Sequence, residues 1–356
     1  MRKRVLSNIC AILCTVSLAV GFLAVFYFAW NAGTAETVKA IVALAVSLVL
    51  VPILHELGHI AFASGTNMEI VYAKFFCFRL TRKKGKLRLG LASPFGAEET
   101  QAIPKTGGNM KKRAKAYTLG GLIVSGVETA VILAGAIILS CFGKSNFFLW
   151  GLVPYSSYLL VLNALPLEYG SGKTDALVYR GIQKGYDAEK TMLVAMEIQG
   201  RLYAGESFAQ IEEELYYGVP QLVEDEPLFA VMLDLRYRYH LEREEYEKAA
   251  SNLNRLASLQ EYLSDSELEK VAAELVYMHA LHGDRERADA CGKSCEAYLA
   301  GDTAQAKRIL AAYSYAFGKT DAVPVLKELA ESALSYERME GVREFERTLL
   351  SRIPTA

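Results

Sequence analysis

The sequence lacks the strong net charge and the regularly spaced cysteines that mark two common classes of protein. Its 356 residues carry a formal net charge of −1, with 39 Lys and Arg against 40 Asp and Glu. Without a basic excess to displace counterions from phosphates, the chain is not expected to bind nucleic acid. Six cysteines are scattered along the chain, mostly in or beside apolar segments, so a disulfide scaffold is not expected.

Charge is also missing from long apolar runs in the first half of the chain. Residues 8–30 contain no charged side chain, and a helix of that length spans about 34 Å, enough to cross a bilayer. This run is longer than the apolar core of a signal peptide and no small-x-small cleavage site follows it, so we expect an uncleaved span. Three further runs, 38–64, 117–142 and 147–167, are also long enough. The sequence predicts a mainly α-helical fold, with a bundle of about four spans in residues 1–180 and the lipid bilayer as a partner.

The connections between these runs differ sharply in charge. The loop between the second and third runs carries twelve Lys or Arg, whereas the two short connections together carry only Lys144. The positive-inside rule then places both termini and the basic loop in the cytoplasm. Within this loop, "MEIVYAKFFCFRL" and "KLRLGLAS" flank the turn "TRKKGK" and predict a small cytoplasmic β-hairpin, whose lysines could lie against anionic lipid.

The second apolar run contains polar residues that are costly inside a membrane. His55, Glu56 and His59 form the pattern H-E-x-x-H. On a helix the two histidines lie one turn apart on the same face, so both imidazoles can bind one ion. Zn²⁺ activates water and polarises a carbonyl, and Glu56 is placed to act as general base. The pattern predicts a zinc site for amide hydrolysis; the alternative is that the three side chains satisfy one another inside the bundle.

A catalytic zinc site needs a third protein ligand and an open fourth position. The fourth apolar run ends in "NALPLEYGSGKTDA", which antiparallel packing brings to the membrane face where His55 lies. Two acids in this stretch, Glu168 and Asp175, are candidates for the third ligand.

These motifs together resemble the site-2 protease family of polytopic, zinc-dependent intramembrane proteases. Members combine H-E-x-x-H with a later Asn-x-x-Pro…Asp-Gly element, which corresponds here to Asn163-Ala164-Leu165-Pro166 and then Asp175. The resemblance implies that Asp175 is the third ligand, with Glu168 as runner-up, and that Asn163 contacts substrate. The interval to Asp175 is longer than the common form, and Ala176 replaces the glycine. The implied substrates are membrane-anchored proteins or peptides, cleaved by a multi-pass protein of the cell membrane.

The family also tends to carry a Gly-Pro-x-x-Asn element in the intervening span and a sheet that receives the unwound substrate. Here Gly120 and Gly121 are present, which predicts close helix packing. Leu122 and Ser125 stand where Pro and Asn are expected, so no specific hydrogen bond from Ser125 is predicted.

Residues 181–356 read as consecutive helices. The stretches "EEYEKAA", "RERADAC" and "DAVPVLK" recur at intervals between 36 and 41 residues and resemble the second helices of tetratricopeptide repeats. We therefore expect a cytoplasmic α-helical repeat domain that can bind a protein partner. An inactive membrane adaptor using this domain is the alternative function. His279, His282, Cys291 and Cys295 are interpreted as packing residues rather than a second metal site.

Overall fold

The computed structural model describes residues 2–83, 85–93, 99–144, 146–169 and 172–355. Their contacts divide the chain into two compact units. The first unit comprises Met1–Ile103 and Asn109–Glu189, and the second comprises Pro104–Gly108 and Lys190–Ala356. The sequence places the division after residue 180, whereas the contacts place it after Glu189 and assign the short segment Pro104–Gly108 to the second unit.

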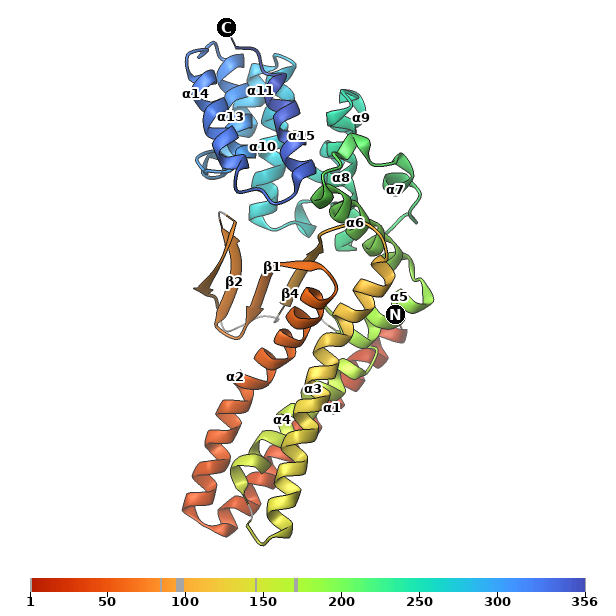
Figure 1. Ribbon diagram of the computed structural model, residues 1–356, viewed down its shortest axis with the longest axis vertical. Helices are drawn as coiled ribbons and strands as arrows, with labels where there is room; N and C mark the ends of the chain where they lie inside the picture. Colours follow the sequence, from red (N-terminus) through yellow and green to blue (C-terminus); the bar gives the residue numbers. More distant parts are fainter. Residues whose placement is uncertain (1, 84, 94–98, 145, 170–171, 356) are drawn as a thin grey trace. The chain divides into compact units, whose positions relative to one another are not determined.

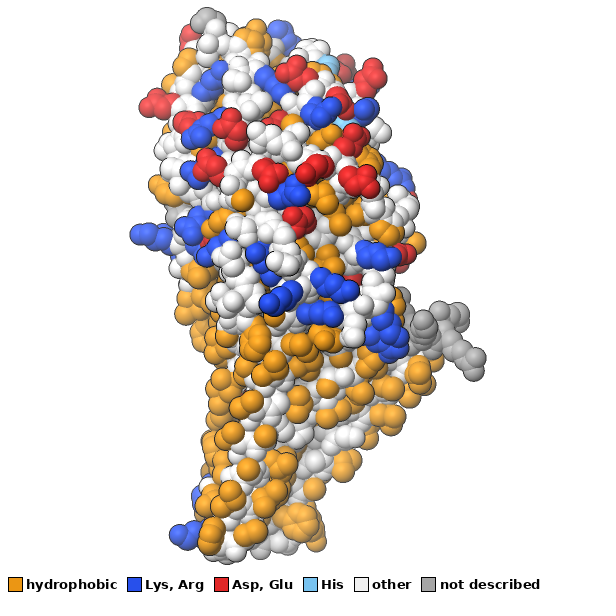
Figure 2. Space-filling model, turned by 45° about the vertical axis from the view of Figure 1, so that its right-hand side comes forward, with side chains coloured by type: hydrophobic (Ala, Val, Ile, Leu, Met, Phe, Trp, Pro, Cys, Tyr) orange, Lys and Arg blue, Asp and Glu red, His pale blue; other side chains and the backbone are white. Residues whose placement is uncertain are grey.

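Four long helices dominate the first unit (Figure 1). They are α1 (Arg2–Ala32), α2 (Thr34–Gly65), α3 (Met110–Cys141) and α4 (Phe147–Ala164). Each is long and apolar enough to cross a membrane. Hydrophobic side chains are spread over the face of this bundle that Figure 2 shows, and Leu23, Val127 and Val131 are at least 60% exposed. An apolar surface of this extent indicates a membrane protein, as the sequence predicts.

Small residues let the helices of the bundle approach closely. A Cβ atom added to Gly58 of α2 would lie 2.5 Å from the carbonyl oxygen of Gly120 in α3, and one added to Gly120 would lie 2.5 Å from that of Gly58. A Cβ atom added to Gly151 of α4 would likewise lie 2.7 Å from Cβ of Ala43 in α2. Helices in lipid associate largely through such packing, so these contacts fix how α2 faces α3 and α4.

A four-stranded sheet follows α2 and corrects the prediction of a single hairpin. The strands β1 (Met68–Phe75), β2 (Phe78–Lys83), β3 (Lys86–Leu91) and β4 (Glu99–Pro104) are arranged in the order β3-β2-β1-β4. The expected hairpin is present as β2 and β3, with Leu80 opposite Leu89, and Lys84 of its turn lies outside the described residues. The stretch expected to be one strand instead turns at Phe76, whose φ of 50° allows β1 to pair with β2.

Apart from Pro104, the last residue of β4, the regular secondary structure described in the second unit is helical. After α6 (Asp187–Ala204), which crosses the unit boundary, its main α-helices are α8 (Pro227–Glu242), α9 (Tyr246–Ala257), α10 (Asp265–Leu281), α11 (Arg285–Ser294), α13 (Ala304–Ala316), α14 (Ala322–Leu334) and α15 (Glu340–Ser351). Three stretches singled out in the sequence lie at the beginnings of α9, α11 and α14, and these helices pack against α8, α10 and α13. Fully buried Tyr237, Tyr277 and Phe345 lie in the shared core.

Candidate metal centre

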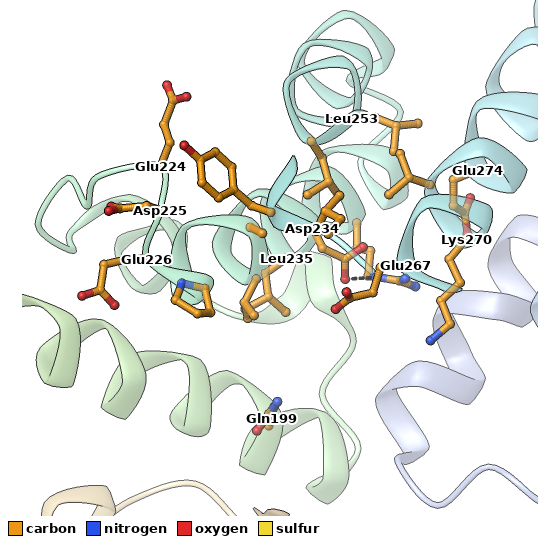
Figure 3. Close-up of a pocket in the computed structure, with 18 of the residues that line it drawn as sticks. Gln199, Glu224, Asp225, Glu226, Asp234, Leu235, Leu253, Glu267, Lys270 and Glu274 are labelled. Carbon is orange, nitrogen blue, oxygen red and sulfur yellow. Dashed lines mark hydrogen bonds and ion pairs between the residues drawn. The ribbon is translucent and has the colours of Figure 1, made fainter. Parts of the chain in front are cut away.

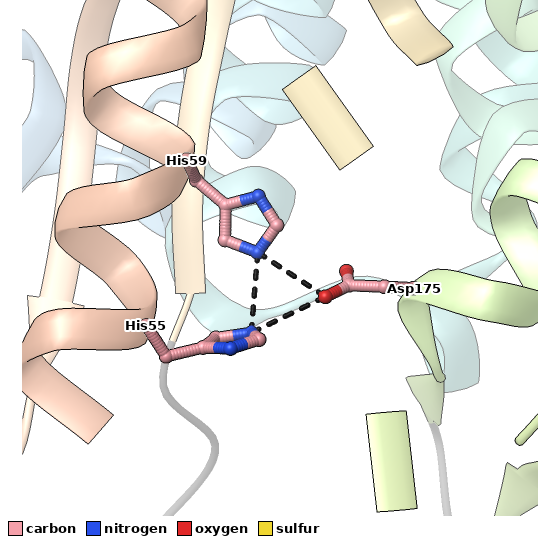
Figure 4. Close-up of side chains that lie close together, drawn as sticks. All are labelled: His55, His59 and Asp175. Atoms are coloured by element: carbon pink, nitrogen blue, oxygen red, sulfur yellow. Dashed lines mark hydrogen bonds and ion pairs between the residues drawn. The ribbon is translucent and has the colours of Figure 1, made fainter. Parts of the chain in front are cut away.

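His55, His59 and Asp175 converge in the first unit, although more than 110 positions separate the histidines from the aspartate in sequence (Figure 4). The two Nε2 atoms are 3.3 Å apart. Oδ2 of Asp175 lies 3.2 Å from Nε2 of His55 and 3.4 Å from Nε2 of His59. All three side chains are largely buried, and the three atoms form a nearly equilateral triangle.

The size of this triangle fits a tetrahedral ion. Ligand atoms about 2.0 Å from a tetrahedral centre lie about 3.3 Å from one another, so nitrogen and oxygen ligands of zinc have this spacing. The three measured separations are 3.2, 3.3 and 3.4 Å. Oδ2 of Asp175 is buried and accepts no hydrogen bond from the described residues, although the two Nε2 atoms lie close to it. The residues present therefore fit a divalent metal with three protein ligands.

The histidine rings are oriented by α3. Nδ1 of His59 donates a hydrogen bond of 2.8 Å to the carbonyl oxygen of Tyr117, which leaves the lone pair of Nε2 directed at the centre. Nδ1 of His55 lies 2.9 Å from Oγ of buried Ser125. The sequence did not predict this bond, and the structure therefore corrects the expectation for Ser125. The available signal was that Ser125 stands where the Gly-Pro-x-x-Asn element of site-2 proteases has asparagine.

Gly121 makes room for the two rings. A Cβ atom at this position would lie 2.4 Å from Nε2 of His59 and 2.7 Å from Nε2 of His55. Any side chain here would occupy the space of the ligand atoms, so the centre depends on a glycine in α3.

Asp175 is positioned by a short hairpin that follows α4. The strands β5 (Glu168–Tyr169) and β6 (Gly172–Lys173) pair, and α5 (Asp175–Lys184) begins directly after Thr174. The hydroxyl of Thr174 donates to the carbonyl of Leu165 at 2.6 Å and accepts from the amide of Leu167 at 3.0 Å. These bonds fix the first residue of α5 relative to the end of α4, and the helix dipole favours an anion there.

The charge state of Asp175 suits a cation. Burial by itself would raise the pKa of Asp175, but the adjacent imidazoles of His55 and His59 lower it below its usual value. The carboxylate is therefore ionised at neutral pH, which is the form that binds a metal ion.

Glu56 lies beside the centre and contacts the sheet. Its carboxylate is buried and accepts a hydrogen bond from the hydroxyl of Thr100 in β4. The hydroxyl of Tyr117 in turn donates to the carbonyl of Thr100. Hydrogen bonds thus join α2 to β4 and β4 to α3 beside the metal site. No local sequence pattern indicated this link.

The remaining predicted residues lie outside the triangle. Glu168 is exposed in β5 and does not belong to the metal-ligating cluster found among the described residues, so the structure places Asp175 and not Glu168 with the histidines. Asn163 lies in the last turn of α4, where its amide donates to the carbonyl of Leu159 at 3.3 Å. Its role toward substrate stays a prediction. Cys291 and Cys295 join no metal-ligating cluster in the described ranges.

Comparisons with protein-family models, with curated proteins and with solved structures found no match to this chain.

Proposed function

We propose that this protein is an intramembrane zinc endopeptidase of the site-2 protease type, which hydrolyses peptide bonds in or near the membrane-spanning segments of anchored substrates. The observation that carries the proposal is the spacing of His55, His59 and Asp175, which matches that of tetrahedral ligands. Two of these residues lie in α2, a helix long and apolar enough to cross a membrane. Ionisable side chains are energetically costly at such a position, so their presence there supports a function.

The chemistry follows from the donor set. A bound zinc ion would polarise the scissile carbonyl and lower the pKa of water toward neutrality. Glu56 accepts a proton from the attacking water as the water oxygen bonds to the carbonyl carbon. It then passes this proton to the leaving amine as the carbon–nitrogen bond breaks. Thr100 holds the Glu56 carboxylate beside the centre. Asn163 is the proposed donor to the substrate backbone or to the developing oxyanion.

The proposed topology places both termini and the helical unit in the cytoplasm of a multi-pass cell-membrane protein. The basic loop between α2 and α3 supports this orientation through the positive-inside rule. His55 and His59 belong to the last three turns of α2, which ends at Gly65 and leads within two residues to β1. The centre is therefore proposed to open toward the cytoplasmic side, where water is available for hydrolysis.

The test pairs zinc content with cleavage. Tagged single-span reporter proteins are co-expressed with the wild-type chain, with Glu56→Gln and with Glu36→Gln, a control at the other end of α2 where Glu36 pairs with Lys39. Purified wild type and both variants should hold one equivalent of zinc by elemental analysis. Reporter cleavage should be lost in Glu56→Gln alone. Cleavage that persists in Glu56→Gln would contradict the proposal.

A second candidate is a membrane adaptor without catalytic activity. The stacked helix pairs of the second unit favour it, because such stacks commonly bind proteins. This function requires neither zinc nor Glu56. Wild-type chain that purifies without zinc and cleaves no reporter, yet retains a protein partner, would favour the adaptor over the peptidase.

A further inference from the structure

A groove of about 490 Å³ lies within the second unit, in a size range typical of ligand sites (Figure 3). Two facing helices provide most of its lining, α8 with Ala230, Val231 and Asp234 and α10 with Lys270 and Val271. Each is the first helix of a packed pair. Leu253 and Leu256 of α9 add to the lining, whereas no described residue of α11 or α14 does.

The floor of the groove is apolar. Leu235, Leu253 and Leu256 lie along it and are almost completely buried. Toward the mouth, Val231 and Tyr262 are 38% and 49% exposed. A side chain entering the groove would bury these exposed surfaces, so the site favours a ligand with at least one apolar group.

Carboxylates outnumber cations around this floor. The acidic lining residues are Glu224, Asp225, Glu226, Asp234, Glu267 and Glu274, and the basic ones are Arg238 and Lys270. Arg255 and Arg308, outside the lining, pair with Glu224 and Glu274. Six acids thus face four bases even when these two are counted. Asp225, which is exposed at the mouth, forms no ion pair with any residue in the described part of the chain.

We propose that the groove binds a Lys- and Arg-rich peptide segment that carries an apolar side chain. The negative charge of the groove repels acidic peptides, and its apolar floor favours a peptide with an apolar side chain over a purely polar peptide. The natural source is the cytoplasmic flank of a membrane-anchored substrate, an assignment that rests on the proposed peptidase function. Cytoplasmic flanks of membrane spans are enriched in Lys and Arg, so an acidic groove on that side selects substrates with a basic cytoplasmic extension.

The experiment measures peptide binding without cleavage. The proposal of a peptide-binding groove can therefore fail independently of the proposed peptidase function. The full chain is placed in nanodiscs of zwitterionic lipid, with empty nanodiscs as background, and titrated into a fluorescently labelled peptide of lysines, glycines and two leucines. Two matched peptides replace the lysines by glutamates or the leucines by alanines. The Glu56→Gln chain should bind the lysine peptide as the wild type does, whether or not the wild type cleaves proteins.

We expect the lysine–leucine peptide to bind most tightly, with an affinity that falls as salt is added. Asp225→Lys should weaken binding about tenfold. Asp302→Lys, an exposed aspartate outside the groove, should leave it unchanged. Equal binding of the lysine and glutamate peptides would overturn the proposal, as would equal affinities of Asp225→Lys and Asp302→Lys. Loss of the leucine dependence would overturn the role of the apolar floor.

Discussion

The Nδ1 atoms of His55 and His59 each have a partner in α3, whereas their Nε2 atoms face Asp175. Each Nδ1 is within hydrogen-bond distance of an oxygen of α3, the carbonyl of Tyr117 or the hydroxyl of Ser125. Such outer partners orient an imidazole and raise its basicity as a ligand. Only the hydroxyl can be removed by substitution, because the other oxygen belongs to the main chain.

Ser125→Ala should weaken zinc binding by about 10- to 100-fold, because His55 loses the partner that orients its ring. Chelator competition on purified protein measures the affinity. Ser156→Ala is the control, since Ser156 is a buried serine of the same bundle whose hydroxyl bonds to Val153 of its own helix. Equal losses in both variants would mean that Ser125 acts through packing alone.

Asp175→Ala should lower zinc affinity by more than about 100-fold, since losing a ligand costs more than losing its hydrogen-bond partner. Glu168→Ala should retain the metal, because Glu168 is exposed in β5. Elemental analysis of both variants tests the assignment. The opposite result, with zinc kept in Asp175→Ala and lost in Glu168→Ala, would transfer the third ligand to Glu168.

At the scale of elements, the metal centre depends on how closely α2 and α3 pack. Gly58 and Gly120 bring the two backbones together, and Gly121 gives the imidazoles their space. A single added methyl group at Gly121 would therefore act on the ligand atoms directly, while the rest of α3 could stay in place.

Gly121→Ala should destabilise the bundle by about 1–3 kcal/mol through overpacking and should abolish stoichiometric zinc binding. Gly126→Ala is a matched control, because a Cβ atom there would meet only Leu160 at 3.9 Å. Thermal melting and zinc content measure the two effects. Normal zinc content in Gly121→Ala would show that the rings can shift without loss of the site.

The elements differ in how far the sequence predicted them. The four apolar helices were predicted because length and hydropathy are local properties. The turn at Phe76 was missed because an uninterrupted aromatic and β-branched run contains no Gly, Pro or Asn to mark it. β4 was missed because "ETQAIP" lacks apolar alternation. The ligands His55 and His59 follow from helical spacing, but the partnership of Glu56 with Thr100 depends on tertiary packing.

At the scale of the whole molecule, each unit has a polar cluster of its own. In the second unit, fully buried Arg308 donates to Glu346 at 2.7 Å and to Glu274 at 2.6 Å, and its guanidinium lies 4.1 Å from the ring centre of Tyr277. Burial raises the pKa of Glu346, whereas the pKa of Glu274 is lowered, against the effect of burial, by Arg308 and Arg238. A fully buried cation thus lies between two buried acids in this unit.

Arg308→Met should destabilise the second unit by about 3–5 kcal/mol, because it leaves Glu274 and Glu346 without their shared cation. Both folded-state pKa values should then lie above the unfolded values, so the variant should regain stability as the pH falls from about 7 to about 5. Thermal melting by circular dichroism measures this dependence. Arg347→Met, which breaks the exposed pair with Glu331, should cost less than about 1 kcal/mol. A pH-independent loss in Arg308→Met would contradict this account.

Two of the candidate ligands lie in the span α2, and the third lies at the start of α5, after the span α4. His55 and His59 share α2, whereas Thr174 couples Asp175 to Leu165 at the end of α4. A tilt of α4 would therefore change the distances from Oδ2 to the imidazoles before it changed the distance between the imidazoles. Because helix tilt adjusts to hydrocarbon thickness, we expect the affinity of this candidate site for a metal ion to depend on the length of the surrounding acyl chains.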